Sequence, residues 1–168
     1  DAGKGTQQDF FIREGIAVFR GKDRQKGGLQ KWRVLAPKFS SAVQGKRYLD
    51  VGAYRGLFAF KALEYGASLS IALEPSEPFV QFMEEAKNKY QLDQLLVRQG
   101  DFFDPTTFEE LRNHEVHCVS CLGVIHHLLR IGISRCVLTT YDELIEQISL
   151  LAGESVFIEF ALPLEDTL

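Results

Sequence analysis

The sequence has few cysteines and lacks any long apolar run. Its 168 residues include three cysteines, which do not follow the spacing of a disulfide framework. No apolar run reaches the roughly 18 to 20 residues needed to cross a bilayer, and no signal-peptide pattern opens the chain. These absences argue against a disulfide-stabilised secreted domain and against a membrane protein. We therefore expect a cytoplasmic protein with free thiols.

Positive charge is also scarce. The 19 Lys and Arg residues are outnumbered by 23 Asp and Glu residues, and the formal net charge is -4. This balance argues against a protein that binds nucleic acid through bulk charge. One local basic stretch contains Arg20, Lys22, Arg24, Lys26, Lys31 and Arg33. We interpret this stretch as a solvated segment, with an RNA contact as the alternative.

The chain divides into a polar lead-in, residues 1–45, and a domain from residue 46 to residue 168. The lead-in is expected to be partly helical, with helix-compatible patches around Phe10, Phe11, Ile16 and Phe19 and a loop at Lys26–Gly28. In the domain, short apolar runs alternate with segments of helical period, as in successive βα units. We predict five strands: Arg47–Val51, Leu69–Leu73, Leu95–Arg98, Val116–Leu122 and Ser155–Phe160.

Two of the intervening segments show one apolar face at helical spacing. The first face consists of Phe79, Met83, Ala86 and Tyr90, and the second of Tyr141, Leu144, Ile145, Ile148 and Leu151. Gly66 and Gly153 follow helical segments, where a left-handed cap favours glycine. The right-handed crossover rule then predicts an α/β fold, a doubly wound, mostly parallel sheet with helices on both faces, of Rossmann-like type.

The segment "YLDVGAYRGLFAF", residues 48–60, places an acid and two glycines where the first strand becomes a helix. Ligands of such folds bind beyond the carboxyl ends of the strands at this point. Gly52 keeps the strand end open, and Gly56 lets the next helix approach. A dinucleotide site requires G-x-G-x-x-G, whereas Tyr54 replaces a glycine here and Asp50 repels phosphate. The loop therefore suits a phosphate-free ligand with a positive end, such as S-adenosylmethionine.

Two further acids follow the next two predicted strands. Glu74, in "IALEPSE", can accept hydrogen bonds from the hydroxyls of a ribose. Asp101, in "QGDFFD", can accept a hydrogen bond from an adenine amino group, while Phe102 supplies an apolar wall. Three strand ends thus carry acids at intervals that fit one adenosyl ligand.

Four motifs, in order, resemble those of the class I S-adenosylmethionine-dependent methyltransferases: "LDVGAYRG", "LEP", "GDFF" and "SCLGVIHHL". This resemblance covers residues 48–160 and implies a methyltransferase with S-adenosylmethionine as cofactor. The cofactor-binding residues it implies are Asp50, Gly52, Ala53, Gly56, Glu74, Pro75, Asp101, Phe102, Leu122 and Gly123. The family usually ends with a sixth and a seventh strand, for which this chain is too short. We expect either a C-terminal truncation or a substrate pocket completed by another segment.

The acceptor of the methyl group is expected to be a small molecule, attacked at oxygen or nitrogen. His126 and His127 are the catalytic candidates, because a histidine can orient or deprotonate the acceptor. The first alternative is an RNA acceptor bound by the basic stretch. The second is a non-catalytic S-adenosylmethionine-binding module of a larger protein, and a nicotinamide-dependent oxidoreductase is the least favoured.

Several other motifs are given structural interpretations. Cys118 and Cys121 are three apart on a predicted strand and would point to opposite faces, so no metal site is expected in "HEVHCVSCLGVIHH". "AGKGTQ", residues 2–7, copies part of a phosphate-binding loop but has no strand before it. The acids of residues 142–146 are interpreted as a solvated face. Glu159 and Asp166 remain weak candidates near the substrate.

Overall fold

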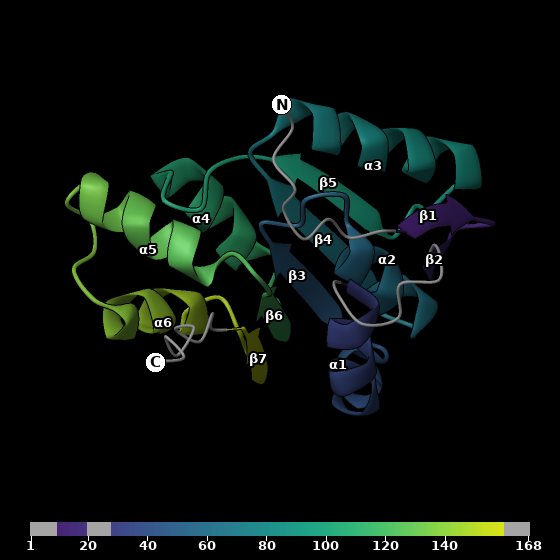
Figure 1. Cartoon of the computed structure of the whole chain (residues 1–168), viewed down its shortest axis with the longest axis horizontal. Coiled ribbons are helices and arrows are strands. Elements are labelled where there is room, and N and C mark those ends of the chain that lie inside the picture. Colours follow the sequence, from purple (N-terminus) through teal and green to yellow (C-terminus); the bar gives the residue numbers. More distant parts are fainter. Residues whose placement is uncertain (1–9, 20–27, 160–168) are drawn as a thin grey trace, which may run out of the picture.

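The computed structural model describes residues 10–19 and 28–159, and a parallel five-stranded sheet lies at its centre (Figure 1). Its strands are β3 (Arg47–Val51), β4 (Leu69–Glu74), β5 (Leu95–Gln99), β6 (Cys118–Cys121) and β7 (Ser155–Ile158). Their spatial order is β5-β4-β3-β6-β7. The chain moves outward from β3 to β5 and then continues on the other side of β3. This reversal creates the switch point beside β3 at which ligands of such sheets bind.

All five predicted strands are confirmed, with small changes at their ends. The sheet is parallel throughout, with Tyr48 of β3 opposite Ser70 on one side and Cys118 on the other. The fourth strand is shorter than predicted, since Val116 and Leu122 lie outside it. The predicted end of the last strand, Phe160, lies outside the described residues.

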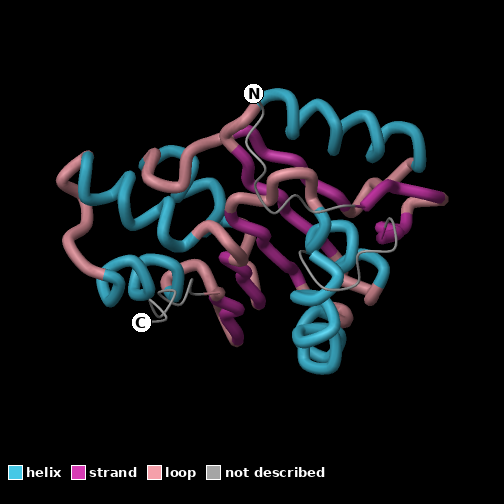
Figure 2. The backbone as a smooth tube through the Cα atoms, in the orientation of Figure 1, coloured by secondary structure: helices cyan, strands magenta, loops and turns pink. Residues whose placement is uncertain are grey.

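Helices cover both faces of this sheet, as predicted (Figure 2). One face carries α1 (Gly28–Val43), α2 (Leu57–Glu64) and α3 (Glu77–Tyr90), and the other carries α4 (Pro105–Asn113), α5 (Ile125–Ser134) and α6 (Tyr141–Ser149). Each face has its own apolar cluster, because successive strand side chains alternate. Cys118 belongs to the first cluster and Cys121 to the second, so the prediction that they point apart is confirmed.

The predicted helical faces are largely buried. Met83 and Ala86 of α3, and Leu144 and Ile148 of α6, lie in the core, whereas Tyr141 is exposed at the first turn of α6. Within the described ranges, no helix combines the length and the apolar character required to cross a bilayer.

The two predicted glycine caps have different outcomes. Gly66 follows α2 with φ of 84°, so its left-handed cap is confirmed. Gly153 has no positive φ, and the prediction of a left-handed cap there is wrong. Its N–H donates to the Val116 carbonyl, and an added Cβ would lie 3.2 Å from that oxygen. Close approach to the chain entering β6 therefore explains this glycine.

The beginning of the lead-in is a β-hairpin, not a helix. Strands β1 (Phe10–Arg13) and β2 (Ile16–Phe19) pair antiparallel through a two-residue turn, Glu14 and Gly15, both with positive φ. The prediction of helix-compatible patches is wrong here, because this turn allows the short apolar runs to pair. The lead-in does contain a helix, α1, but it lies after the patches on which the expectation was based. Residues 1–9 and 20–27, which include "AGKGTQ" and most of the basic stretch, lie outside the described residues, and the boundary at residue 45 stays a prediction.

The hairpin packs on the helices that support the glycine loop. Phe10 is fully buried, and the Arg55 guanidinium lies 4.3 Å from the Phe82 ring centroid and 5.6 Å from that of Phe10. The Tyr90 hydroxyl donates to the Ile12 carbonyl over 3.0 Å. The N-terminal strands therefore extend the scaffold behind the predicted ligand site.

Candidate functional site

The three predicted acids lie at the carboxyl edge of adjacent strands. Asp50 is in β3, Glu74 is the last residue of β4, and Asp101 comes two residues after β5. Because β3, β4 and β5 are neighbours in a parallel sheet, these residues share one edge. Each carboxylate nevertheless has a different environment.

Asp50 is buried among polar side chains of the central strands. It is 2% exposed, and its Oδ1 accepts a hydrogen bond from the Ser120 hydroxyl over 2.7 Å. Because that proton of Ser120 is used, the Tyr48 hydroxyl donates to Ser120 Oγ over 2.5 Å. Oδ2 of Asp50 is buried and has no hydrogen-bond partner among the described residues. Burial raises the pKa of Asp50 to about 7, and the charge of Glu74 adds to this, while the Ser120 hydrogen bond opposes it.

Glu74 connects the glycine loop to α3. It is 7% exposed, its Oε2 accepts the Tyr54 N–H over 2.7 Å, and its Oε1 accepts the Ser76 N–H over 3.0 Å. Ser76 is the N-cap residue of α3, and the exposed Pro75 lies between it and Glu74. Each carboxylate oxygen keeps a further lone pair for a ligand hydroxyl.

The glycine loop, residues 52–56, is held tightly on three sides. The N–H groups of Gly52 and Ala53 both donate to the Leu73 carbonyl of β4. A Cβ on Gly52, where φ is 70°, would lie 2.5 Å from Val124 Cγ2. One on Gly56, where φ is 81°, would lie 2.6 Å from Met83 Sδ. Gly56 thus permits the close helix approach that we expected, and Gly52 has an additional packing role that the sequence did not indicate.

Two residues of the glycine loop, Tyr54 and Arg55, rest on α3. Tyr54 has φ of 56°, and its ring centroid lies 4.0 Å from that of Phe79. Arg55 lies over Phe82, three residues further along the same helix. Aromatic contacts and the Glu74 carboxylate therefore stabilise a left-handed backbone that a non-glycine residue rarely adopts.

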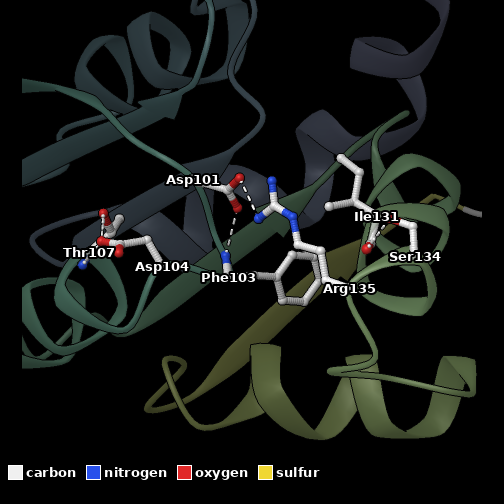
Figure 3. Close-up of polar contacts among 7 residues, drawn as sticks. All are labelled: Asp101, Phe103, Asp104, Thr107, Ile131, Ser134 and Arg135. Atoms are coloured by element: carbon white, nitrogen blue, oxygen red, sulfur yellow. Dashed lines mark hydrogen bonds and ion pairs between the residues drawn. The ribbon is translucent and has the colours of Figure 1, made fainter.

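The third strand end contains an ion pair that the sequence did not reveal. Asp101 Oδ1 accepts the Phe103 N–H over 2.9 Å, and Oδ2 lies 2.7 Å from Nη1 of Arg135, the C-cap residue of α5 (Figure 3). Phe102 is 3% exposed, and its ring contacts those of Phe103 and Phe108 in the core. Its expected role as an apolar wall stays a prediction, since little of it reaches the surface.

The fourth strand end carries the histidine candidates. Leu122 and Gly123 follow β6, Gly123 has φ of 77°, and α5 begins two residues later. His126 and His127 lie in its first turn with ring centroids 3.9 Å apart. The catalytic role of these histidines stays a prediction.

The two histidines differ in their hydrogen bonds. Nδ1 of His127 lies 2.9 Å from an Arg130 guanidinium nitrogen and must accept, because arginine only donates. Burial lowers the pKa of His127, and the neighbouring His126 and Arg130 lower it further. Nδ1 of His126 is buried without a hydrogen-bond partner in the described part of the chain.

The other candidates are separate from this edge or only border it. In the ranges 10–19 and 28–159, no group of three His, Cys, Asp or Glu residues could hold a metal ion. Glu143 is exposed and belongs to a capping box with Thr140 at the start of α6. Glu159 follows β7, and its N–H donates to the Cys121 carbonyl, whereas Asp166 lies outside the described residues.

Replacing Gly52 tests the contact between the first and fourth strand ends. Gly52→Ala adds both left-handed strain and a clash with Val124, whereas Gly45→Ala, at a φ of 71° with no atom nearby, adds the strain alone. We expect Gly52→Ala to lower the free energy of unfolding by about 1 to 3 kcal/mol more than Gly45→Ala, measured by urea denaturation. Adding Val124→Ala should remove most of this difference. Equal losses in the two alanine variants would contradict the contact.

The burial of Asp50 predicts a pH-dependent stability. Its folded pKa of about 7 lies above the ordinary 3.8, so its contribution is complete below about pH 4 and is lost as the pH rises through 7. Asp50→Asn is the reference, because its amide does not titrate in this range. The unfolding free energy of wild type should therefore fall relative to Asp50→Asn by up to about 1.4 kcal/mol per pH unit between about pH 4 and 7. Urea denaturation across this range measures the difference, and parallel profiles would contradict the raised pKa.

Comparisons with known proteins agree with this architecture. No protein-family model matches the chain. The tRNA U34 carboxymethyltransferase of Dichelobacter nodosus (strain VCS1703A) is 32% identical over 96 residues, which are 56% of this chain and 28% of that relative. The chain thus spans less than a third of the curated relative it matches.

Two solved structures share the fold at low identity. WbdD, a bifunctional kinase-methyltransferase, has a TM-score of 0.61 at 19% identity over 81% of this chain and 30% of its own. A methyltransferase from Thiobacillus denitrificans, in complex with S-adenosyl-L-homocysteine, has a TM-score of 0.56 at 13% identity over 78% of this chain and 48% of its own. The parallel sheet, its strand order and these neighbours identify the fold of this chain as that of the class I S-adenosylmethionine-dependent methyltransferases.

Proposed function

We propose that this chain binds S-adenosylmethionine and belongs to an enzyme that transfers the methyl group to an acceptor. The observation that carries the proposal is the position of Glu74. Its carboxylate lies at the end of β4 and also receives the N–H of Tyr54 in the glycine loop. The hydrogen bond therefore joins the proposed ribose-binding carboxylate of Glu74 to the glycine loop, and both lie at the switch point of the sheet.

The residues at this edge fit such a ligand. Glu74 accepts from the ribose hydroxyls, Asp101 accepts from the adenine amino group, and Leu122 and Gly123 border the methionine end. Asp50, whose Oδ2 lacks a partner among the described residues, offsets the positive charge of the ligand through its field, since its burial leaves little surface for contact. A ligand with a phosphate is disfavoured, because the phosphate would lie near three acidic side chains. The cation of the loop, Arg55, rests on Phe82.

The histidines have different tasks in this proposal. S-adenosylmethionine, when bound, supplies an electrophilic methyl group, whose bond to sulfur breaks as an oxygen or nitrogen attacks. His127 is neutral near pH 7, and because Nδ1 accepts from Arg130 its proton is on Nε2. His127 therefore orients the acceptor by donation from Nε2. Proton removal from the acceptor falls to His126, whose ring lies 3.9 Å from that of His127 in the same turn of α5.

Two acceptor classes remain candidates. A small molecule agrees with the acidic net charge of -4. RNA is favoured by the 32% identity to a relative named for tRNA U34. The non-catalytic module is the third outcome, in which the ligand binds but no transfer occurs.

Calorimetry with S-adenosylhomocysteine, the product of methyl transfer, tests the ligand. Wild type should bind this ligand, and Glu74→Ala should bind it more weakly by about 1 to 3 kcal/mol, because the hydrogen bonds to a charged acceptor are lost. Glu77→Ala, an exposed acid in the first turn of α3, is the matched control and should bind as wild type does. NAD binding in preference to S-adenosylhomocysteine would overturn the proposal. Thermal unfolding of each variant separates loss of binding from loss of fold.

Transfer of a radiolabelled methyl group distinguishes the acceptors. If RNA is the acceptor, label should enter purified tRNA, and tRNA binding should weaken steeply as salt increases, because counterions are released from the phosphates. Label in a small-molecule extract but not in tRNA would support the first class. Tight binding of S-adenosylhomocysteine with no transfer to either would support the non-catalytic module.

A further inference from the structure

The Asp101 carboxylate is fixed at both of its oxygens. Oδ1 accepts the Phe103 N–H over 2.9 Å, and Oδ2 pairs with Nη1 of Arg135 at 2.7 Å (Figure 3). The side chain is still 34% exposed, so part of it faces solvent. Each oxygen has two acceptor positions, and one of each is used. The carboxylate is therefore oriented without being saturated.

Arg135 reaches this position from a different part of the fold. It caps α5, and its N–H donates to the Ile131 carbonyl over 3.0 Å. The chain then turns back sharply, since Val137 and Leu138 both donate to the Gly132 carbonyl. A Cβ on Gly132 would lie 2.5 Å from Leu138 Cδ1, which shows how closely the loop covers the helix. The backbone that carries Arg135 is thus held in place by its own hydrogen bonds and packing.

This cation distinguishes Asp101 from the other two acids at the edge. Asp50 is bound by a hydroxyl and Glu74 by two backbone N–H groups, and neither has an ion pair among the described residues. The nearby Arg98 pairs with Glu110 of α4. Arg135 is therefore the charged partner of Asp101 in the described part of the chain.

We propose that Arg135 is a positioning residue for base recognition: it holds the Asp101 carboxylate in one orientation, so that the site selects an adenine over a hypoxanthine base. This inference rests on the proposed function. An ionised carboxylate only accepts hydrogen bonds. It attracts the exocyclic amino group of adenine and repels the carbonyl oxygen that replaces it in inosine. A fixed acceptor increases that discrimination, because the unfavourable base cannot be accommodated by rotation of the carboxylate.

The test compares S-adenosylhomocysteine with S-inosylhomocysteine by calorimetry. Wild type should prefer the adenosyl ligand, and Arg135→Gln should reduce this preference roughly tenfold, since a charge-assisted contact is lost. Arg135→Lys should retain most of it, because the contact uses a single nitrogen that an ammonium group can replace. Asp101→Asn should lose the preference, and adding Arg135→Gln to it should cause no further loss.

Arg112→Gln is the matched control. Arg112 is exposed on α4 and pairs with Glu109, so its replacement should leave the preference unchanged. A preference in Arg135→Gln equal to that of this control would overturn the inference, and so would tighter binding of S-adenosylhomocysteine, which would mean that Arg135 competes with the base. Failure of wild type to bind S-adenosylhomocysteine would instead overturn the proposed function and this inference with it. Thermal unfolding confirms that each variant is folded.

Discussion

The carboxylate of Glu74 is the interaction on which the site depends. It receives one backbone N–H from the glycine loop and one from the start of α3. These two segments follow different strands, β3 and β4, and without this acceptor two N–H groups at a largely buried position would lose their partner. Because Glu74 lies at the end of β4 and binds the loop, the position of that strand sets the position of the loop. The geometry of the site therefore depends on the pairing of β3 and β4.

The three acids at the strand edge show how environment gives one residue type different properties. Asp50 is buried and hydrogen-bonded to Ser120, so its charge is costly and its pKa is raised. Glu74 is bound by backbone N–H groups, and Asp101 by one N–H and one guanidinium. A protonated Asp50 lowers the repulsion between these groups, and a cationic ligand favours its ionised form. Binding of a cationic ligand would consequently be linked to loss of the Asp50 proton.

Helix α5 carries residues of two proposed roles. Its first turn carries His126 and His127, which would lie beside a methyl acceptor. At its other end, the C-cap residue Arg135 pairs with Asp101. The helix packs through Ile125 and Leu128 on the same apolar cluster as α6. A change in the packing of α5 would therefore affect both ends. This arrangement explains how an arginine 34 positions after Asp101 in the sequence can lie beside it.

Local patterns in the sequence were sufficient to predict the five strands of the sheet. The five strands followed from short apolar runs, and the buried faces of α3 and α6 followed from helical spacing, because burial of a strand or helix face requires a repeat that is visible in the residues themselves. The pattern failed at Phe10–Phe19, where a two-residue turn at Glu14 and Gly15 pairs the strands, since short apolar runs fit either a strand or a helix.

The sequence by itself determined the order of the motifs and the placement of three acids at three strand ends. Only the tertiary structure decided what surrounds each acid. Ser120 beside Asp50, Tyr54 N–H on Glu74 and Arg135 on Asp101 all join residues between 20 and 70 positions apart. No local repeat encodes such contacts, because they arise from strand register and from the direction in which each loop leaves the sheet. Electrostatics acts through space, and the distances exist only once the chain is folded.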